Sequence, residues 1–246
     1  MHLTELYPIS TSCIQSTSIF LQFKYNKTSK TIQGVSYDYI LLQFLAHLTS
    51  IIGIFSFRSS TIKSQYRIRW SSEVCTIPPL IPLIELLTLI ASTGILAQLV
   101  IYKSTRGSNQ GISRYCQGFI VTILLPFLYL IKLWTFKQAK INELDLADYV
   151  WAMYKLFVNL QYCPQVMVNW MDDKVNGLHP YWLHLQLGYA VLELTDRVVN
   201  GAVWADVSIL FPNLPLILIK DISLGILGLQ YYIYREKSSE VHYKEV

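Results

Sequence analysis

Amide side chains occur at one spacing in two apolar stretches of the chain, offset by 143 residues. Such groups offer both hydrogen-bond donors and acceptors, which lipid cannot satisfy, so they suit a water-filled path for a neutral or zwitterionic solute. Bonds between helices, worth about 0.6 kcal/mol each in membranes, are the alternative use of the same groups. We interpret the two stretches as one repeat present twice. The matched residues are Gln22, Asn26, Gly34 and Gln43 in the first stretch and Gln165, Asn169, Gly177 and Gln186 in the second.

Ionisable side chains inside apolar stretches are the second chemical feature. Each costs about 2.5 to 3.5 kcal/mol near the centre of a bilayer, so it needs a function or a partner. Glu85 and Asp221 each follow prolines and lie at related depth in two apolar stretches, which makes them candidates for proton coupling. Pairing with another helix is the alternative for both. Glu193 and Arg197 are four residues apart, and we expect these two to pair along one helix.

The segments that must position these side chains are unusually apolar. Hydrophobic residues make up 52% of the chain and charged residues 15%, whereas a soluble domain carries about 25% charge. Crossing the hydrocarbon core of about 30 Å takes about 20 residues, and several apolar runs reach that length. Seven spans are predicted, at about residues 6–23, 39–57, 79–102, 118–136, 149–170, 181–203 and 207–234.

The repeat extends to the third and seventh spans. GILAQLVIYK begins at Gly94 and GILGLQYYIYR at Gly225, and both end in Gln, two residues, Ile, Tyr and a base. We therefore predict an all-α membrane protein whose seven transmembrane helices form two parallel three-helix bundles joined by a linker helix. The expected division is a first repeat in residues 1–107, a linker helix in 108–140, a second repeat in 141–235 and a disordered tail in 236–246.

Charge and cysteine distribution argue against other classes of protein. The net charge is +4, but the basic residues fall in short clusters between apolar stretches, as in cytosolic loops, and nucleic acid is not expected as a partner. The four cysteines are scattered, and no metal-ligand cluster, nucleotide-binding loop or nucleophile elbow occurs. We expect neither enzyme activity nor a metal or cofactor. With a lumenal N-terminus and a cytosolic C-terminus, more of the basic loop residues face the cytosol than the lumen, so we expect this orientation.

Pro164 and Gln165, followed by Asn169, a charged turn and Gly177, resemble the motif of the PQ-loop family of seven-helix membrane proteins. That family includes the lysosomal cystine exporter cystinosin, vacuolar amino-acid exporters and, more distantly, SWEET sugar transporters and KDEL receptors. The resemblance covers both halves, roughly residues 10–57 and 155–235. It implies the same fold, and a substrate path lined by Gln22, Asn26, Gln43, Pro164, Gln165, Asn169 and Gln186.

Two departures from the family pattern matter. Leu21 stands where the first repeat would have proline, so only the second repeat has the Pro-Gln pair. Gln186 stands where proton-coupled cystinosin-like transporters have aspartate, and an amide cannot titrate. Proline removes a backbone donor and loosens the preceding turn, so Pro164 predicts a kink near Leu160.

These features predict a secondary transporter of a small neutral or zwitterionic, amino-acid-like solute, working by alternating access. The expected setting is the bilayer of an endomembrane: vacuole or lysosome, Golgi or endoplasmic reticulum. Protons are a second partner if Glu85 or Asp221 couples transport to a proton gradient. The alternative is a protein of the same fold that moves no solute and acts in membrane trafficking, cargo reception or lipid scrambling. No sequence pattern indicates an oligomeric state.

Overall fold

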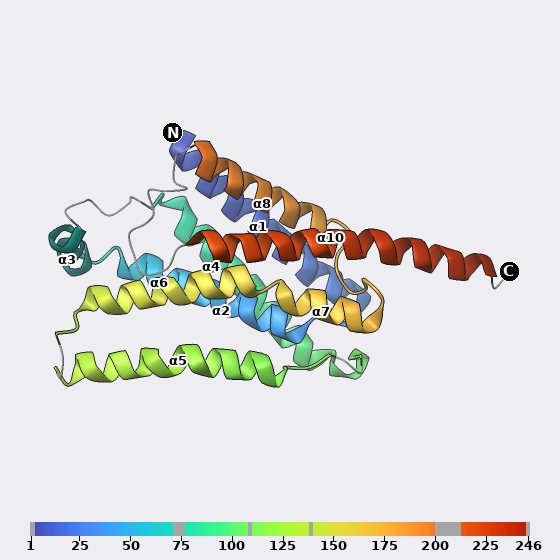
Figure 1. Cartoon of the computed structure of the whole chain (residues 1–246), viewed down its shortest axis with the longest axis horizontal. Helices are drawn as coiled ribbons and strands as arrows, with labels where there is room; N and C mark the ends of the chain where they lie inside the picture. Colours follow the sequence, from blue (N-terminus) through green and yellow to red (C-terminus); the bar gives the residue numbers. More distant parts are fainter. Residues whose placement is uncertain (1–2, 71–76, 108–109, 138–139, 200–212, 245–246) are drawn as a thin grey trace.

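The computed structural model describes residues 3–70, 77–107, 110–137, 140–199 and 213–244 (Figure 1). Within these residues every regular element is helical. The helices are α1 (Leu3–Ser29), α2 (Tyr37–Ser56), α3 (Ser60–Trp70), α4 (Leu80–Ile101), the 3-10 turn η1 (Lys103–Thr105), α5 (Arg114–Thr135), α6 (Glu143–Leu160), α7 (Cys163–Asp172), α8 (Trp182–Val199) and α10 (Asn213–Lys244). The expectation of an all-α protein is confirmed for this part of the chain.

Four of these helices are long and apolar enough to cross a membrane: α2, α4, α5 and the Pro215–Tyr234 part of α10. They coincide with the second, third, fourth and seventh spans expected from the sequence. The protein covers them to different extents. In the apolar 18-residue stretch of each helix, 56% of the residues of α2 are buried but only 11% of those of α5. A helix so apolar and so little covered needs another apolar environment, which a bilayer supplies.

The helices pack as two similar groups. In the first, α4 packs against both α1 and α2, and in the second, α10 packs against α6, α7 and α8. The groups meet where α1 contacts α8 and where α2 contacts α6 and α7. Figure 1 shows α5 at one edge of the molecule, where it lies alongside α6. We call residues 3–105 the first half and residues 143–244 the second half.

Polar caps set where several helices begin. The hydroxyl groups of Ser36 and Ser113 accept hydrogen bonds from backbone N–H groups in the first turns of α2 and α5. Asn142 and Asp145 form a reciprocal capping box at the start of α6. These caps fix the register of the helices from which the candidate site is built.

The kink expected near Leu160 is present as a break between two helices. Helix α6 ends at Leu160 and α7 begins at Cys163, with Pro164 in its first turn. In the first half α1 continues without interruption through Leu21, which is not a proline. The Pro-Gln pair thus breaks one of two helices that otherwise correspond.

Two elements differ from the sequence expectations. The loop between the second and third spans contains α3, which is held against α6 by buried Ile62 and by the Arg69–Asp145 ion pair of 2.7 Å. Residues 236–246 were expected to be disordered, but α10 continues to Lys244 and projects beyond the bundle (Figure 1). Neither proline nor glycine occurs after residue 228, so nothing in that sequence ends the helix.

Candidate functional site

Gln165, at the start of α7, reaches across to the first half of the molecule. Its Oε1 accepts a hydrogen bond from the backbone N–H of Ser36, and its Nε2 donates to the carbonyl of Gly34, both at 2.8 Å. The same Nε2 donates to Oδ1 of Asn169 at 2.8 Å. The side chain of Gln165 is fully buried, so these bonds satisfy an amide that water cannot reach.

Gln22, on α1, makes the same three contacts in the opposite direction. Its Nε2 donates to Oδ1 of Asn26 at 2.7 Å and to the carbonyl of Gly177 at 2.8 Å. Its Oε1 accepts from the backbone N–H of His179 at 2.8 Å. Every partner lies at the 143-residue offset from its counterpart around Gln165. We call the four bonds between halves, two made by Gln22 and two by Gln165, the glycine-loop contacts.

The backbones of the two glycine loops touch each other. Gly34 has φ +87° and Gly177 has φ +76°, in the left-handed region that favours glycine. A Cβ on Gly34 would overlap the carbonyl of Asn176, and one on Gly177 would overlap the carbonyl of Gln33. The matched glycines of the sequence are therefore positions where both the conformation and the close approach exclude a side chain.

The third helix of each half supports the same region through one more matched bond. Gln98 on α4 donates to the carbonyl of Phe23 on α1 at 3.0 Å, and Gln230 on α10 donates to the carbonyl of Val166 on α7 at 3.0 Å. Phe23 and Val166 are also related by the 143-residue offset. The GILAQ and GILGLQ segments thus carry a structural role that the sequence pattern did not reveal.

Gln43 lies in the core between the halves, bonded to an aromatic pair. Its Nε2 donates to the hydroxyl of Tyr39 at 2.8 Å, and that hydroxyl also accepts from the indole N–H of Trp182 at 3.2 Å. Tyr39 and Trp182 are equivalent residues of the two halves, with ring centroids 5.6 Å apart. Gln43 Oε1 is buried and has no hydrogen-bond partner among the described residues.

Gln186 is the counterpart of Gln43, but its partners differ. Its Oε1 accepts from the hydroxyl of Tyr162 at 2.6 Å, and its Nε2 donates to Ser18 of the other half at 2.6 Å. Gln43 and Gln186 are each 1% exposed. Sequence reasoning identified the two amides but missed Tyr39, Tyr162 and Trp182; the offset between Tyr39 and Trp182, two large aromatic residues, was the available signal.

Each half also contains a contact between an acidic and a basic side chain that joins its second and third helices. In the first half, His47 Nδ1 on α2 lies 2.9 Å from Glu85 Oε2 on α4. In the second half, the Lys220 ammonium on α10 contacts the Glu193 carboxylate on α8, with Asp221 Oδ1 3.9 Å away. The two acids singled out in the sequence, Glu85 and Asp221, are therefore not brought together.

The expected partner of Glu193 was Arg197, whose side chain lies outside the described residues. Among the described residues Glu193 contacts Lys220, which is 1% exposed, and its pairing with Arg197 stays a prediction. The Lys220 ammonium also lies 4.6 Å from the centroid of the Tyr189 ring. Because water cannot reach this ammonium, a carboxylate from a neighbouring helix is needed to balance its charge.

No model of a known protein family matches the chain. The chain is similar to the uncharacterized protein YCL002C of Saccharomyces cerevisiae, with 26% identity over 203 residues, which cover 74% of this chain and 75% of the yeast protein. The alignment spans most of both chains. Because that relative is itself uncharacterized, it points to no activity, and the contacts described above carry the functional argument.

Proposed function

We propose that this chain is a PQ-loop-type secondary transporter, which moves a small neutral or zwitterionic solute such as an amino acid across an endomembrane by alternating access. In this proposal α1, α2 and α4 form one three-helix bundle, and α6 with α7, α8 and α10 form the other. Helix α5 links them, the N-terminus is lumenal and the C-terminus cytosolic. The glycine-loop contacts are the observation that supports the proposal best, because they join two similar halves by matched bonds.

The glycine-loop contacts are suited to act as a gate. They are four hydrogen bonds between the halves, made by Gln22 and Gln165. Each is worth about 0.5 to 1.5 kcal/mol, so together they contribute a few kcal/mol. That is the scale of an equilibrium whose minor state is still populated. Opening needs no change inside either half, because Gln22 and Gln165 each keep the bond to the asparagine on their own helix.

The proposed solute site lies beside this gate, around Gln43 and Gln186. Their amides, with the hydroxyls of Tyr39 and Tyr162, offer donors and acceptors for a carboxylate or carbonyl group. The aromatic faces of Tyr39 and Trp182 suit an ammonium group through cation–π attraction. A solute would replace the bonds that these side chains now make with one another, so binding and separation of the halves would be linked.

Proton coupling remains part of the proposal at Glu85 and Asp221. The contact between Glu85 and His47 supports Glu85 more strongly, because it puts a ring nitrogen within hydrogen-bond distance of the buried carboxylate, at 2.9 Å. Asp221 lies beside the ammonium of Lys220, which offers its negative charge a compensating positive one. We therefore place the exchangeable proton in the first half, between α2 and α4.

One observation favours the alternative, a protein of this fold that acts in trafficking, cargo reception or lipid scrambling. Gln43 and Gln186 are each 1% exposed and bonded to neighbouring side chains. Such an arrangement also suits a rigid scaffold between the halves. The two functions differ in whether a soluble solute crosses the membrane.

Uptake by the purified protein in liposomes separates the two functions. Labelled amino acids and a fluorescent phospholipid are followed in parallel for the unmodified chain, Gln186→Ala and Gln117→Ala, the last a control because Gln117 is exposed on α5. We expect amino-acid uptake that falls at least tenfold in Gln186→Ala and is unchanged in Gln117→Ala. Lipid movement without amino-acid uptake, or uptake insensitive to Gln186→Ala, would contradict the proposed transport path.

A further inference from the structure

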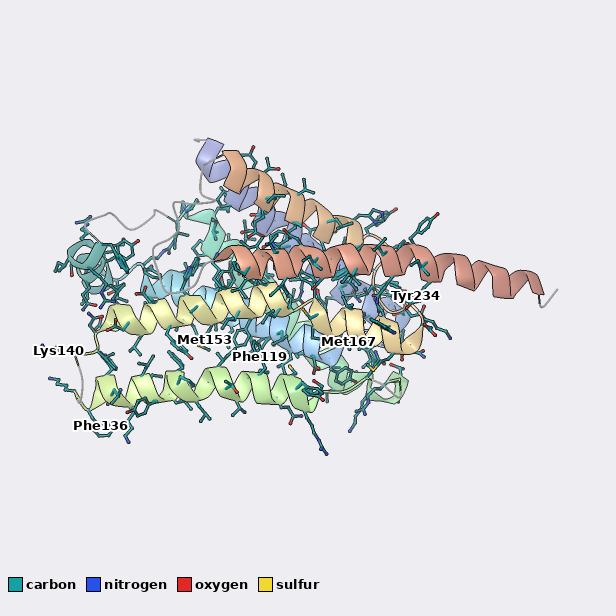
Figure 2. The ribbon with its side chains drawn as sticks, in the orientation of Figure 1. Phe119, Phe136, Lys140, Met153, Met167 and Tyr234 are labelled. Atoms are coloured by element: carbon teal, nitrogen blue, oxygen red, sulfur yellow. The ribbon has the colours of Figure 1, made fainter. Side chains whose placement is uncertain are left out.

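A mostly apolar groove of about 520 Å³ lies beside the break between α6 and α7. Leu42 of α2, Phe119 of α5, and Leu160, Pro164 and Met167 of α6 and α7 are among the residues that line it. In Figure 2 Phe119 and Met167 are labelled on the two helices that flank it. The volume falls in the range of about 300 to 1,000 Å³ that is typical of sites for small molecules.

The groove is bounded by α5, which of the four candidate membrane spans is the one that the protein covers least. Only 11% of the apolar window of α5 is buried, and α5 is one of the candidate membrane spans. Met167 and Met171, on the opposite wall, are more than half exposed at 55% and 54%. Since bilayer lipid surrounds a helix of this kind, hydrocarbon chains are the apolar molecules with direct access to the groove.

One arginine side chain lies at the polar end of the groove, and a second arginine stands in the chain between two residues that line it. The Arg106 guanidinium packs against Gly111, which lines the groove, and lies 5.9 Å from the Tyr37 ring centroid. Arg114, exposed, is the first residue of α5. Asp38 also lines this end, but its Oδ1 accepts a hydrogen bond from the backbone N–H of Ser113 at 2.9 Å. Arginine binds phosphate through paired hydrogen bonds, so this end suits an anionic headgroup.

We propose that the groove binds one acyl chain of an anionic phospholipid, with the phosphate at Arg106 and Arg114 and the chain against Pro164. An apolar chain there fills the space between α5 and the break that separates α6 from α7. Occupancy would therefore restrict rotation of α7 relative to α6, and α7 carries Gln165 of the glycine-loop contacts. The site stands whether or not the protein transports a solute.

The test uses the full chain in liposomes that contain a photoactivatable group in the acyl chain of either phosphatidylserine or phosphatidylcholine. After irradiation, labelled peptides are identified by mass spectrometry. We expect label in residues 114–120 and 160–171, with phosphatidylserine exceeding phosphatidylcholine at least threefold. Equal labelling by the two lipids, or label spread evenly along the exposed face of α5, would overturn the proposal.

Variants test the two parts of the site separately. Met167→Trp with Met171→Trp fills the groove from two exposed positions and should reduce labelling at least fivefold, whereas Leu125→Trp, on the exposed face of α5, should leave it unchanged. Arg106→Gln with Arg114→Gln should bring phosphatidylserine labelling down to the phosphatidylcholine level. Lys63→Gln, on α3, is the matched control for charge. Persistence of the labelling in the filled variant would show that the chain binds elsewhere.

Discussion

The two halves make the same contacts with each other, but the second half completes a chain of hydrogen bonds that the first leaves open. In the second half, Asn169 Nδ2 donates to Gln230 Oε1 at 3.2 Å. In the first half, the corresponding atoms, Asn26 Nδ2 and Gln98 Oε1, are buried without a hydrogen-bond partner among the described residues. The completed chain lies beside the Pro164 break.

The contacts between acidic and basic side chains extend this comparison. Both connect the second and third helices of a half, but the positions of acid and base are exchanged. In the first half the base, His47, is on the second helix and the acid, Glu85, is on the third. In the second half the acid, Glu193, is on the second helix and the base, Lys220, is on the third. The first pair contains an imidazole and the second an ammonium. The halves thus share a frame but enclose different pairs of ionisable side chains.

Breaking these contacts should have the largest effect. Lys220→Met removes the buried ammonium that Glu193 contacts and should lower the free energy of unfolding by about 3 to 5 kcal/mol. His47→Leu should cost less, because the contact it removes is an ion pair only when the histidine is protonated. Thermal unfolding in one detergent measures both variants. A Glu193→Gln, Lys220→Met double variant should regain part of the loss; equal losses from the two single variants would remove the distinction between halves.

The glycines should be equally intolerant in the two halves. Gly34→Ala and Gly177→Ala each force a Cβ into a left-handed conformation and against the backbone of the other loop, at a cost of about 2 to 4 kcal/mol. Gly118→Ala in α5 is the control, because nothing lies within 4 Å of its Cβ position. Unfolding temperatures should fall alike for the two loop variants. Tolerance of either one would show that the loops do not meet as described.

The amides of the glycine-loop contacts should differ between halves. Gln165→Ala and Gln22→Ala each leave buried backbone groups without their partners, which costs about 1 to 3 kcal/mol. We expect the loss to be larger for Gln165→Ala, because its partner Asn169 also bonds Gln230, and the first half lacks the corresponding bond. Chemical denaturation of both variants beside Gln117→Ala measures the difference. A larger loss for Gln22→Ala would reverse the comparison.

The smallest effect should be a pH dependence confined to one loop. Partial burial lowers the pKa of His179, whose Nδ1 accepts a hydrogen bond from the Tyr181 backbone at 3.2 Å. The folded state therefore favours the neutral imidazole of His179. The stability that this group contributes is present above pH 6.5, its ordinary pKa, and is lost as the pH falls through the lower pKa of the folded state. His179→Gln should reduce the difference between the free energies of unfolding at pH 7 and pH 5 by less than about 1 kcal/mol. The first loop has Ser36 at this position and should show no such effect.

The sequence predicted the features that depend on neighbours along the chain. Four of the seven predicted spans are helices long and apolar enough to cross a membrane, and the kink predicted near Leu160 is found as a break between α6 and α7. The four-residue spacing of Gln165 and Asn169 places them on one helix face, where they are bonded. The matched glycines marked a special position in each repeat. Local geometry determines all of these, so residue type and spacing are sufficient.

Features that depend on packing between helices could not be predicted in the same way. Nothing in the spacing says that Gln165 bonds the loop of the other half, or that Lys220 takes Glu193 from α8. Helix α3 was missed because a short polar helix has no apolar stretch, and it is held by contacts with α6. The seven-helix arrangement and the roles of Gln43 and Gln186 stay predictions, which the uptake experiment tests.

The glycine-loop contacts have a consequence for how the chain is assembled. Gln22 of the first half binds the loop of the second half, and its counterpart Gln165 binds the loop of the first half. Each half therefore presents the same groups to the other. An isologous interface between two identical subunits has this property. The two halves meet as a homodimer would, within one polypeptide. Fragments divided in the loop before Ser113 should therefore find each other when co-expressed, and neither half alone would satisfy the buried amides that it presents.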